Sequence, residues 1–173
     1  MSRHGGEGRD QGSDERSGTA QHPGPVRSGS AGVGIIAGGI VLAAWVAGGR
    51  ALFGIAGGLT PLYVCTLGFA IAVLHFFIGL AFMRAAKLGH RIRPITIVQL
   101  AFSWACGLLL GLTIPDVTDS GLQTIVSGAT EPGLSIAVGV ANPLGIICLG
   151  TAVAALVLAG RDARGIRPVV EED

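Results

Sequence analysis

The segment PLYVCTLGFAIAVLHFFIGLAFM, at residues 61–83, decides the expected fold because it carries no Asp, Glu, Lys or Arg over its whole length. An α-helix rises about 1.5 Å per residue, so about 20 apolar residues cross the ~30 Å hydrocarbon core of a bilayer. Residues 61–83 are therefore long enough to form one membrane-spanning helix. The 33 residues between Arg50 and Arg84 contain no charge at all, and Pro61 suits the first turn of a helix.

Three further stretches are equally free of charge. They contain 22, 22 and 29 residues and lie at 28–49, 94–115 and 132–160. Each is long enough for one crossing. The sequence therefore predicts an all-α integral membrane protein, a four-transmembrane-helix bundle of two antiparallel hairpins. The expected spans are about 32–49, 61–83, 94–114 and 134–159. The connection 51–60 is too short to cross and is expected to be interfacial or shallowly re-entrant.

Composition favours the same class. Half of the 173 residues are hydrophobic, 29 are Gly, and only 13% are charged, against about 25% in ordinary soluble domains. A small soluble fold leaves too much surface in water to hide so many apolar side chains. This excludes an ordinary cytosolic enzyme, a nucleic-acid-binding module and a disulfide-stapled secreted scaffold.

The chain divides into three regions. Residues 1–30 are polar, with four Arg balanced by four acids, and are expected to form a disordered cytoplasmic tail without affinity for nucleic acid. Residues 31–160 form the expected four-helix transmembrane domain, and 161–173 a short cytoplasmic tail. A cleaved signal peptide is the alternative for the first span, but a long stretch with four acids before the apolar run is unlike a short basic leader.

Basic residues are distributed unevenly among the expected loops. Arg and Lys collect on the cytoplasmic side of short loops. With four spans and both termini in the cytoplasm, eleven basic residues lie inside and only Arg50 lies outside. The connection 115–133 has no basic residue, and its acids, Asp116, Asp119 and Glu131, are expected to be solvated. Together with Arg, Ala and Gly usage, this pattern predicts the bacterial cytoplasmic (inner) membrane.

The second expected span carries one titratable side chain, His75. It shares a helical face with Gly68, Ala72 and Gly79, at spacings of three and four residues. Small residues on one face are typical of helix contacts in membranes. We expect a neutral His75 hydrogen-bonded across a helix interface, with a proton relay or ligand contact as the alternative.

The third expected span has a polar face and a small-residue spacing. Gln99 and Ser103 lie on the face of Cys106, and the depth of Ser103 matches that of His75, so hydrogen bonds among His75, Ser103 and Gln99 are compatible with the spacing. Gly107 and Gly111 form a GxxxG pair that allows close helix approach.

The fourth expected span contains Asn142 and Pro143. Proline removes one backbone hydrogen bond and kinks a helix. The first interpretation is a kink used for packing, aided by Ala141 and Gly145. The alternative is a broken helix lining a small polar cavity.

Residue types that carry chemistry are sparse. Three separated cysteines without a CxxC pair indicate small core side chains rather than a metal or redox site. His90 lies beside Arg91 and Arg93, with no acid nearby in the sequence, and suggests an anchor for anionic headgroups. We expect no catalytic residues, no metal and no cofactor.

Two functional hypotheses follow. The first is a non-catalytic membrane protein, either an accessory subunit or a self-associating structural protein, whose partners are the lipid bilayer and a membrane protein or further copies of itself. The alternative is a small oligomeric channel or transporter that uses the polar positions His75, Ser103 and Asn142. An enzyme ranks third.

Overall fold

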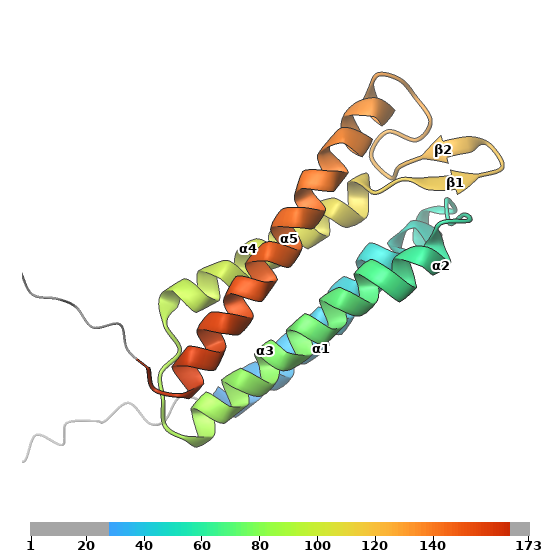
Figure 1. Cartoon of the computed structure of the whole chain (residues 1–173). Helices are drawn as coiled ribbons and strands as arrows, with labels where there is room; N and C mark the ends of the chain where they lie inside the picture. The colour runs from blue at the N-terminus through green and yellow to red at the C-terminus, as the bar shows by residue number, and fades with distance from the viewer. Residues whose placement is uncertain (1–27, 167–173) are drawn as a thin grey trace, which may run out of the picture.

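A computed structural model describes residues 28–166, and this part of the chain is mostly helical (Figure 1). The four long helical segments are separated by short connections. They comprise α1 (Ser28–Gly48) with a 3-10 turn (Gly49–Phe53), α2 (Thr60–Tyr63) with a π-helical turn (Val64–Gly68) and α3 (Phe69–Lys87), α4 (Pro94–Thr113), and α5 (Gly133–Ala163). A two-stranded antiparallel sheet, β1 (Asp116–Thr118) and β2 (Gly121–Gln123), lies between α4 and α5 in sequence.

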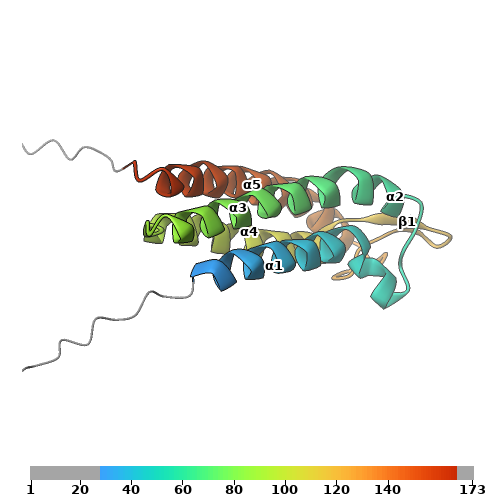
Figure 2. The same ribbon diagram turned by 90° about the horizontal axis from the view of Figure 1, so that it is seen from below.

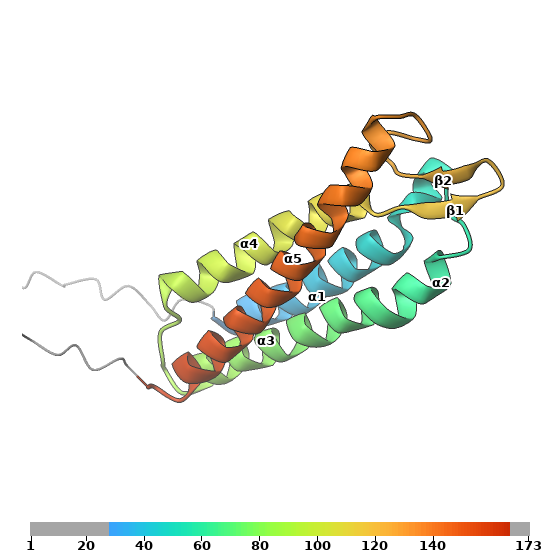
Figure 3. The same ribbon diagram turned by 45° about the horizontal axis from the view of Figure 1, so that its top comes forward.

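The long helices pack in two pairs. α1 lies along α3, α4 lies along α5, and α3 also contacts α5 (Figures 1, 2 and 3). The sheet and the connection before α2 lie at one end, here called the hairpin end. The start of α1, the end of α5 and the loop between α3 and α4 lie at the opposite end, here called the terminal end (Figure 3).

Four helices are long and apolar enough to cross a membrane, as the sequence predicted. They run over Ser30–Phe53, Thr60–Lys87, Pro94–Thr113 and Gly133–Ala163. Three of them extend past their expected ends, from 49 to Phe53, from 83 to Lys87 and from 159 to Ala163. The expected ends lie close to the point where each uncharged run stops at a charged residue. The backbone of a charged residue can still continue the helical hydrogen-bond pattern, so the helices run further. α1 begins at Ser28, within the stretch expected to be a tail, and the rest of that stretch lies outside the described residues.

Adjacent glycines bring α1 close to two other helices. A Cβ atom built on Gly39 would lie 2.1 Å from the Cβ of His75 on α3. A Cβ on Gly38 would lie 2.5 Å from Cη2 of Trp104 on α4. Real Cβ atoms do not approach other heavy atoms this closely, so only glycine fits at these positions. Near the start of α1, a Cβ on Gly32 would lie 2.6 Å from the carbonyl oxygen of Gly79.

The core forms around these contacts. Two clusters of buried apolar side chains follow each other along the bundle. One contains Leu42, Val46, Ile71, Cys106, Leu110 and Cys148, and the other contains Ile35, Ile78, Phe82, Leu100, Ala155 and Ala159. Trp104 packs against both clusters, so the indole connects the two halves of the core.

The close approach at Gly39 predicts a position-specific loss of stability. Gly39→Ala places a methyl group against His75 and should lower the free energy of unfolding by about 1–3 kcal/mol, a usual cost of overpacking. Gly34→Ala is the matched control, because its Cβ would meet nothing within 4 Å and the gain in helix propensity is the same. Thermal unfolding in detergent, followed by tryptophan fluorescence, measures both. Equal midpoints for the two variants would contradict the packing of α1 on α3.

Candidate functional site

A buried ion pair lies at the hairpin end. Arg50 Nε is 3.4 Å from Oδ2 of Asp116, and the two side chains are 1% and 0% exposed. The guanidinium carbon lies 4.5 Å from the centre of the Tyr63 ring, a cation–π distance. Arg50 Nη2 also donates to the carbonyl oxygen of Ala47 at 2.8 Å. We call Arg50, Tyr63, Asp116 and Thr60 the hairpin-end cluster.

The Asp116 carboxylate accepts hydrogen bonds from two parts of the chain. Its Oδ2 accepts a hydrogen bond from Thr60 Oγ1 at 2.6 Å, and its Oδ1 accepts from the backbone N–H groups of Leu59 at 2.9 Å and Val117 at 2.8 Å. The loop before α2 also lies directly on β1, because Gly58 N–H donates to the carbonyl of Val117 at 3.0 Å. A Cβ on Gly57 would lie 1.9 Å from that oxygen. The cluster therefore fixes the connection 54–59 against the start of the sheet.

These contacts determine the protonation state of Asp116. Burial opposes ionisation, but the hydrogen bonds from Thr60, Leu59 and Val117 together outweigh burial and lower the pKa of Asp116 below its ordinary value. The carboxylate is thus the favoured form, as its pairing with Arg50 requires.

The prediction that the acids of this connection are all solvated is wrong for Asp116. Asp119 and Glu131 are exposed, whereas Asp116 is buried. Its partner Arg50 lies 66 positions earlier, so no local spacing reveals the pair. Glu131 accepts hydrogen bonds from the N–H of Ser135 at 3.2 Å and from its hydroxyl at 2.8 Å, at the start of α5.

A second ion pair lies at the terminal end. The Nε of Arg93 donates to Oδ1 of Asp162, and Thr96 Oγ1 donates to Oδ2 at 2.7 Å. The backbone N–H of Arg93 also donates to Oδ2 at 3.1 Å. Asp162 therefore places a carboxylate at the N-terminus of α4, where the helix dipole favours an anion. No acid lies near Arg93 in the sequence, but the last turn of α5 supplies one in the structure.

His75 lies in the middle of the bundle and is 0% exposed. Its Nδ1 lies 2.8 Å from the carbonyl oxygen of Ile71, one turn earlier in α3, so among the described residues the expected hydrogen bond across a helix interface is not formed. A carbonyl can only accept, so Nδ1 is the nitrogen that carries the hydrogen. The Nε2 atom and the Nε1 atom of Trp104 are buried with no hydrogen-bond partner in the described structure. The two rings are neighbours, with centroids 6.2 Å apart.

The sequence-derived polar positions are not gathered into one site. Ser103 Oγ donates to the carbonyl of Cys148 at 2.9 Å and not to His75. Gln99 is half-buried, and no hydrogen bond joins it to either residue. Asn142 and Pro143 are exposed on the outward side of α5. The hydrogen bonds among His75, Ser103 and Gln99 are therefore not formed within the described residues.

The positions expected at helix contacts all face other parts of the same chain. A Cβ atom built on Gly68 would lie 3.0 Å from the Cβ of Ala47, and one on Gly107 would lie 3.0 Å from Cδ2 of Leu42. A Cβ atom on Gly111 would lie 2.3 Å from Nε1 of Trp45. A Cβ atom on Gly145 would lie 3.8 Å from Cδ2 of Leu110. Gly79 faces Ile36 and Gly32, Ala141 is buried, and Ala72 packs against the core.

Sequence reasoning missed the matching positions on α1. Gly32, Gly38 and Gly39 supply the other side of the contacts with α3 and α4. Trp45 Nε1 also donates to the carbonyl of Leu108 at 3.0 Å. The signal was present in the glycine-rich first half of α1.

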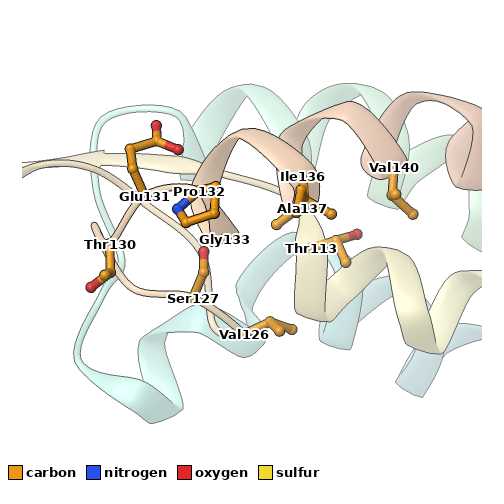
Figure 4. A pocket seen from close by; sticks show the side chains of 10 residues that line it. All are labelled: Thr113, Val126, Ser127, Thr130, Glu131, Pro132, Gly133, Ile136, Ala137 and Val140. Carbon is orange, nitrogen blue, oxygen red and sulfur yellow. The ribbon is translucent and has the colours of Figure 1, made fainter.

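Hollows open on the surface of residues 28–166, including a larger and a smaller one. The larger, about 490 Å³, lies between the connection 126–133 and the beginning of α5 (Figure 4). Its floor is apolar, with Ile136, Ala137 and Val140, and its rim holds Ser127, Thr130 and Glu131. The smaller, about 300 Å³, lies between α1 and α4 beside Trp45 and Trp104. Neither brings two titratable side chains together.

Groups able to bind a metal are not assembled in residues 28–166. This range contains no cluster of three or more His, Cys, Asp or Glu side chains. Cys65 is exposed, Cys106 and Cys148 are buried, and all three are free thiols. Comparisons with protein-family models, curated proteins and solved structures found no match. The functional argument therefore rests on the residues of this chain.

The hairpin-end cluster predicts a large difference between two acids of one connection. Asp116→Asn leaves the buried Arg50 without its counter-ion and should lower the free energy of unfolding by about 3 kcal/mol. Asp119→Asn, at an exposed position, should change it by less than about 0.5 kcal/mol. Unfolding in mixed micelles at neutral pH measures both.

The lowered pKa of Asp116 gives this prediction a pH dependence. A carboxyl whose pKa is lower in the folded state stabilises the protein above the unfolded-state pKa of about 3.9, and this contribution is lost as pH falls through the folded-state pKa. The parent protein should therefore lose stability below about pH 4, and Asp116→Asn should lose less over the same range. Parallel pH profiles would count against a paired carboxylate.

Proposed function

We propose that this chain is a non-catalytic multi-pass membrane protein of the bacterial cytoplasmic membrane, either an accessory subunit or a self-associating structural protein. The observation that carries the proposal is the use of the two buried carboxylates. Asp116 pairs with Arg50, and Asp162 pairs with Arg93. Both pairs join segments of the same chain at opposite ends of the bundle, so the buried acids hold the chain together.

The outward surface supports lipid and partner contacts. Large apolar side chains are exposed on every long helix, among them Val41, Phe76, Phe77, Leu108 and Ile146. In water such a surface would drive aggregation, whereas in a bilayer it is the ordinary lipid-facing surface. α1 with α3, and α4 with α5, then form two antiparallel transmembrane hairpins.

The distribution of charge supports an orientation with both termini in the cytoplasm. Among residues 28–166, the terminal end carries five exposed basic residues, Arg84, Lys87, Arg91, Arg161 and Arg164, whereas the exposed charges of the hairpin end are Asp119 and Glu131. Basic residues favour the cytoplasmic side of short loops. The hairpin end then faces the outside.

Assembly is tested best with the intact protein. Purification from native membranes in a mild detergent, followed by the mass of the intact complex, should give either a stoichiometric foreign protein or a homo-oligomer. Gly107 and Gly111 contact Leu42 and Trp45 of the same chain, so variants there would report on folding. An outward variant, Ile146→Ser, should weaken assembly without lowering the unfolding midpoint. A monomer without a partner in native membranes would contradict the proposal.

One observation keeps a small oligomeric channel or transporter as the second candidate. The Nε2 atom of His75 is buried in the bundle and has no partner, which is the state of a group able to accept a proton. This candidate predicts proton uptake by proteoliposomes, read with an enclosed pH-sensitive dye, that falls at least about tenfold in His75→Leu. His75→Gln controls for packing, and Asn142→Leu controls for an outward polar position. No uptake above empty liposomes, or uptake equal in all variants, removes His75 from any transport mechanism.

A further inference from the structure

Five basic side chains at the terminal end are exposed and unpaired. Arg84 and Lys87 belong to the last turn of α3, Arg91 to the following loop, and Arg161 and Arg164 to the end of α5. None of the five forms an ion pair or hydrogen bond with another described residue, in contrast to Arg93, whose Nε is bound to Asp162.

Hydrogen bonds join the segments that carry these side chains. The N–H of His90 donates to the carbonyl of Ala85 at 2.9 Å, which folds the loop back on α3. The Nδ1 of His90 donates to the carbonyl of Ala163 at 3.1 Å, which ties the same loop to the end of α5. Arg91 therefore belongs to a loop that is bonded to both of the helix ends that carry the other four cations.

The charge at this end is not neutralised within the described structure. Asp162 is the one acid there between residues 28 and 166, and it is occupied by Arg93 and Thr96. The Nη2 atom of Arg93 is itself buried without a partner. The surface therefore has a net positive charge that an anion can offset.

Apolar side chains accompany the cations. Leu88, beside Lys87, is 55% exposed, and Ile166, at the end of the described chain, is 52% exposed. A cationic rim next to exposed apolar side chains matches the boundary between phosphate groups and acyl chains, where Arg and Lys extend their charged ends toward the headgroups. A free anion in solution would not contact the exposed apolar side chains of Leu88 and Ile166.

We propose that Arg84, Lys87, Arg91, Arg161 and Arg164 form a binding surface for the phosphate group of anionic phospholipids in the adjoining leaflet. Guanidinium groups bind phosphate oxygens in a bidentate manner, and four of the five cations are Arg. The inference rests on the proposed function, because it needs the terminal end to lie at a bilayer surface. The inference adds to the proposed function a class of lipid and the residues that would select that lipid.

The test measures lipid binding on the full chain in detergent by native mass spectrometry. Phosphatidylglycerol should be retained at least about tenfold more strongly than phosphatidylcholine. The double variant Arg91→Gln/Arg164→Gln should lose about tenfold in that preference, since each basic residue near an anionic surface contributes measurably. Arg3→Gln/Arg9→Gln removes the same charge from the first ten residues of the chain and should bind as the parent protein does. Equal retention of the two lipids, or an unchanged preference in the first double variant, would overturn the proposal.

Two further arms separate the source of the phosphate and the failure of the proposed function. Inorganic phosphate at millimolar concentration should not displace phosphatidylglycerol, and full displacement would assign the surface to a soluble anion instead. In a cysteine-free background, Ser120→Cys should react with a membrane-impermeant maleimide in intact bacterial cells, and Leu88→Cys only after permeabilisation. The reverse pattern would refute the orientation while leaving the lipid preference measured in detergent intact.

Discussion

A buried guanidinium needs a counter-ion, and the arrangement of the hairpin end depends on that need. Arg50 is 1% exposed, and removing such a charge from water costs several kcal/mol unless it is paired and hydrogen-bonded. Asp116 supplies the charge and Tyr63 an aromatic face. Asp116 in turn needs donors, which come from Leu59 and Thr60 at the start of α2. One ion pair therefore joins the 3-10 turn after α1, the start of α2 and the first strand. Packing of the long helices alone would not hold these three segments against one another.

Packing in the middle of the bundle depends on a different constraint, which is how closely other helices can approach α1. Gly38 and Gly39 are adjacent in sequence and therefore point in different directions around the helix, one toward Trp104 and the other toward His75. This pair of glycines lets α1 approach α3 and α4 at the same level. In the bilayer that we propose for this bundle, no hydrophobic force draws helices together, so such close packing and interhelical hydrogen bonds would be the main sources of association. The bond from Trp45 to the carbonyl of Leu108 is one of these.

The sequence predicted the parts of the fold that depend on local composition. The four apolar helices follow from four uncharged runs, because length and hydropathy suffice to identify a spanning helix. The residues at the helix ends were missed, since Lys87 and Asp162 are charged but still helical. The two ion pairs were missed because their partners are 66 and 69 positions apart. Asn142 was grouped with His75 and Ser103 because it is a polar residue within an expected span, and its exposure depends on how α5 is rotated in the bundle, which its own sequence does not encode.

The central claim is that Arg50 and Asp116 form an energetically coupled pair that closes the hairpin end. A double-mutant cycle with Arg50→Met and Asp116→Leu, measured as the free energy of unfolding in mixed micelles, tests it most directly. Each single variant leaves one buried charge unpaired, whereas the double variant leaves none. The account predicts that the double variant is more stable than Asp116→Leu alone, with a coupling energy of at least about 1.5 kcal/mol. Additive losses, with a coupling energy near zero, would contradict it.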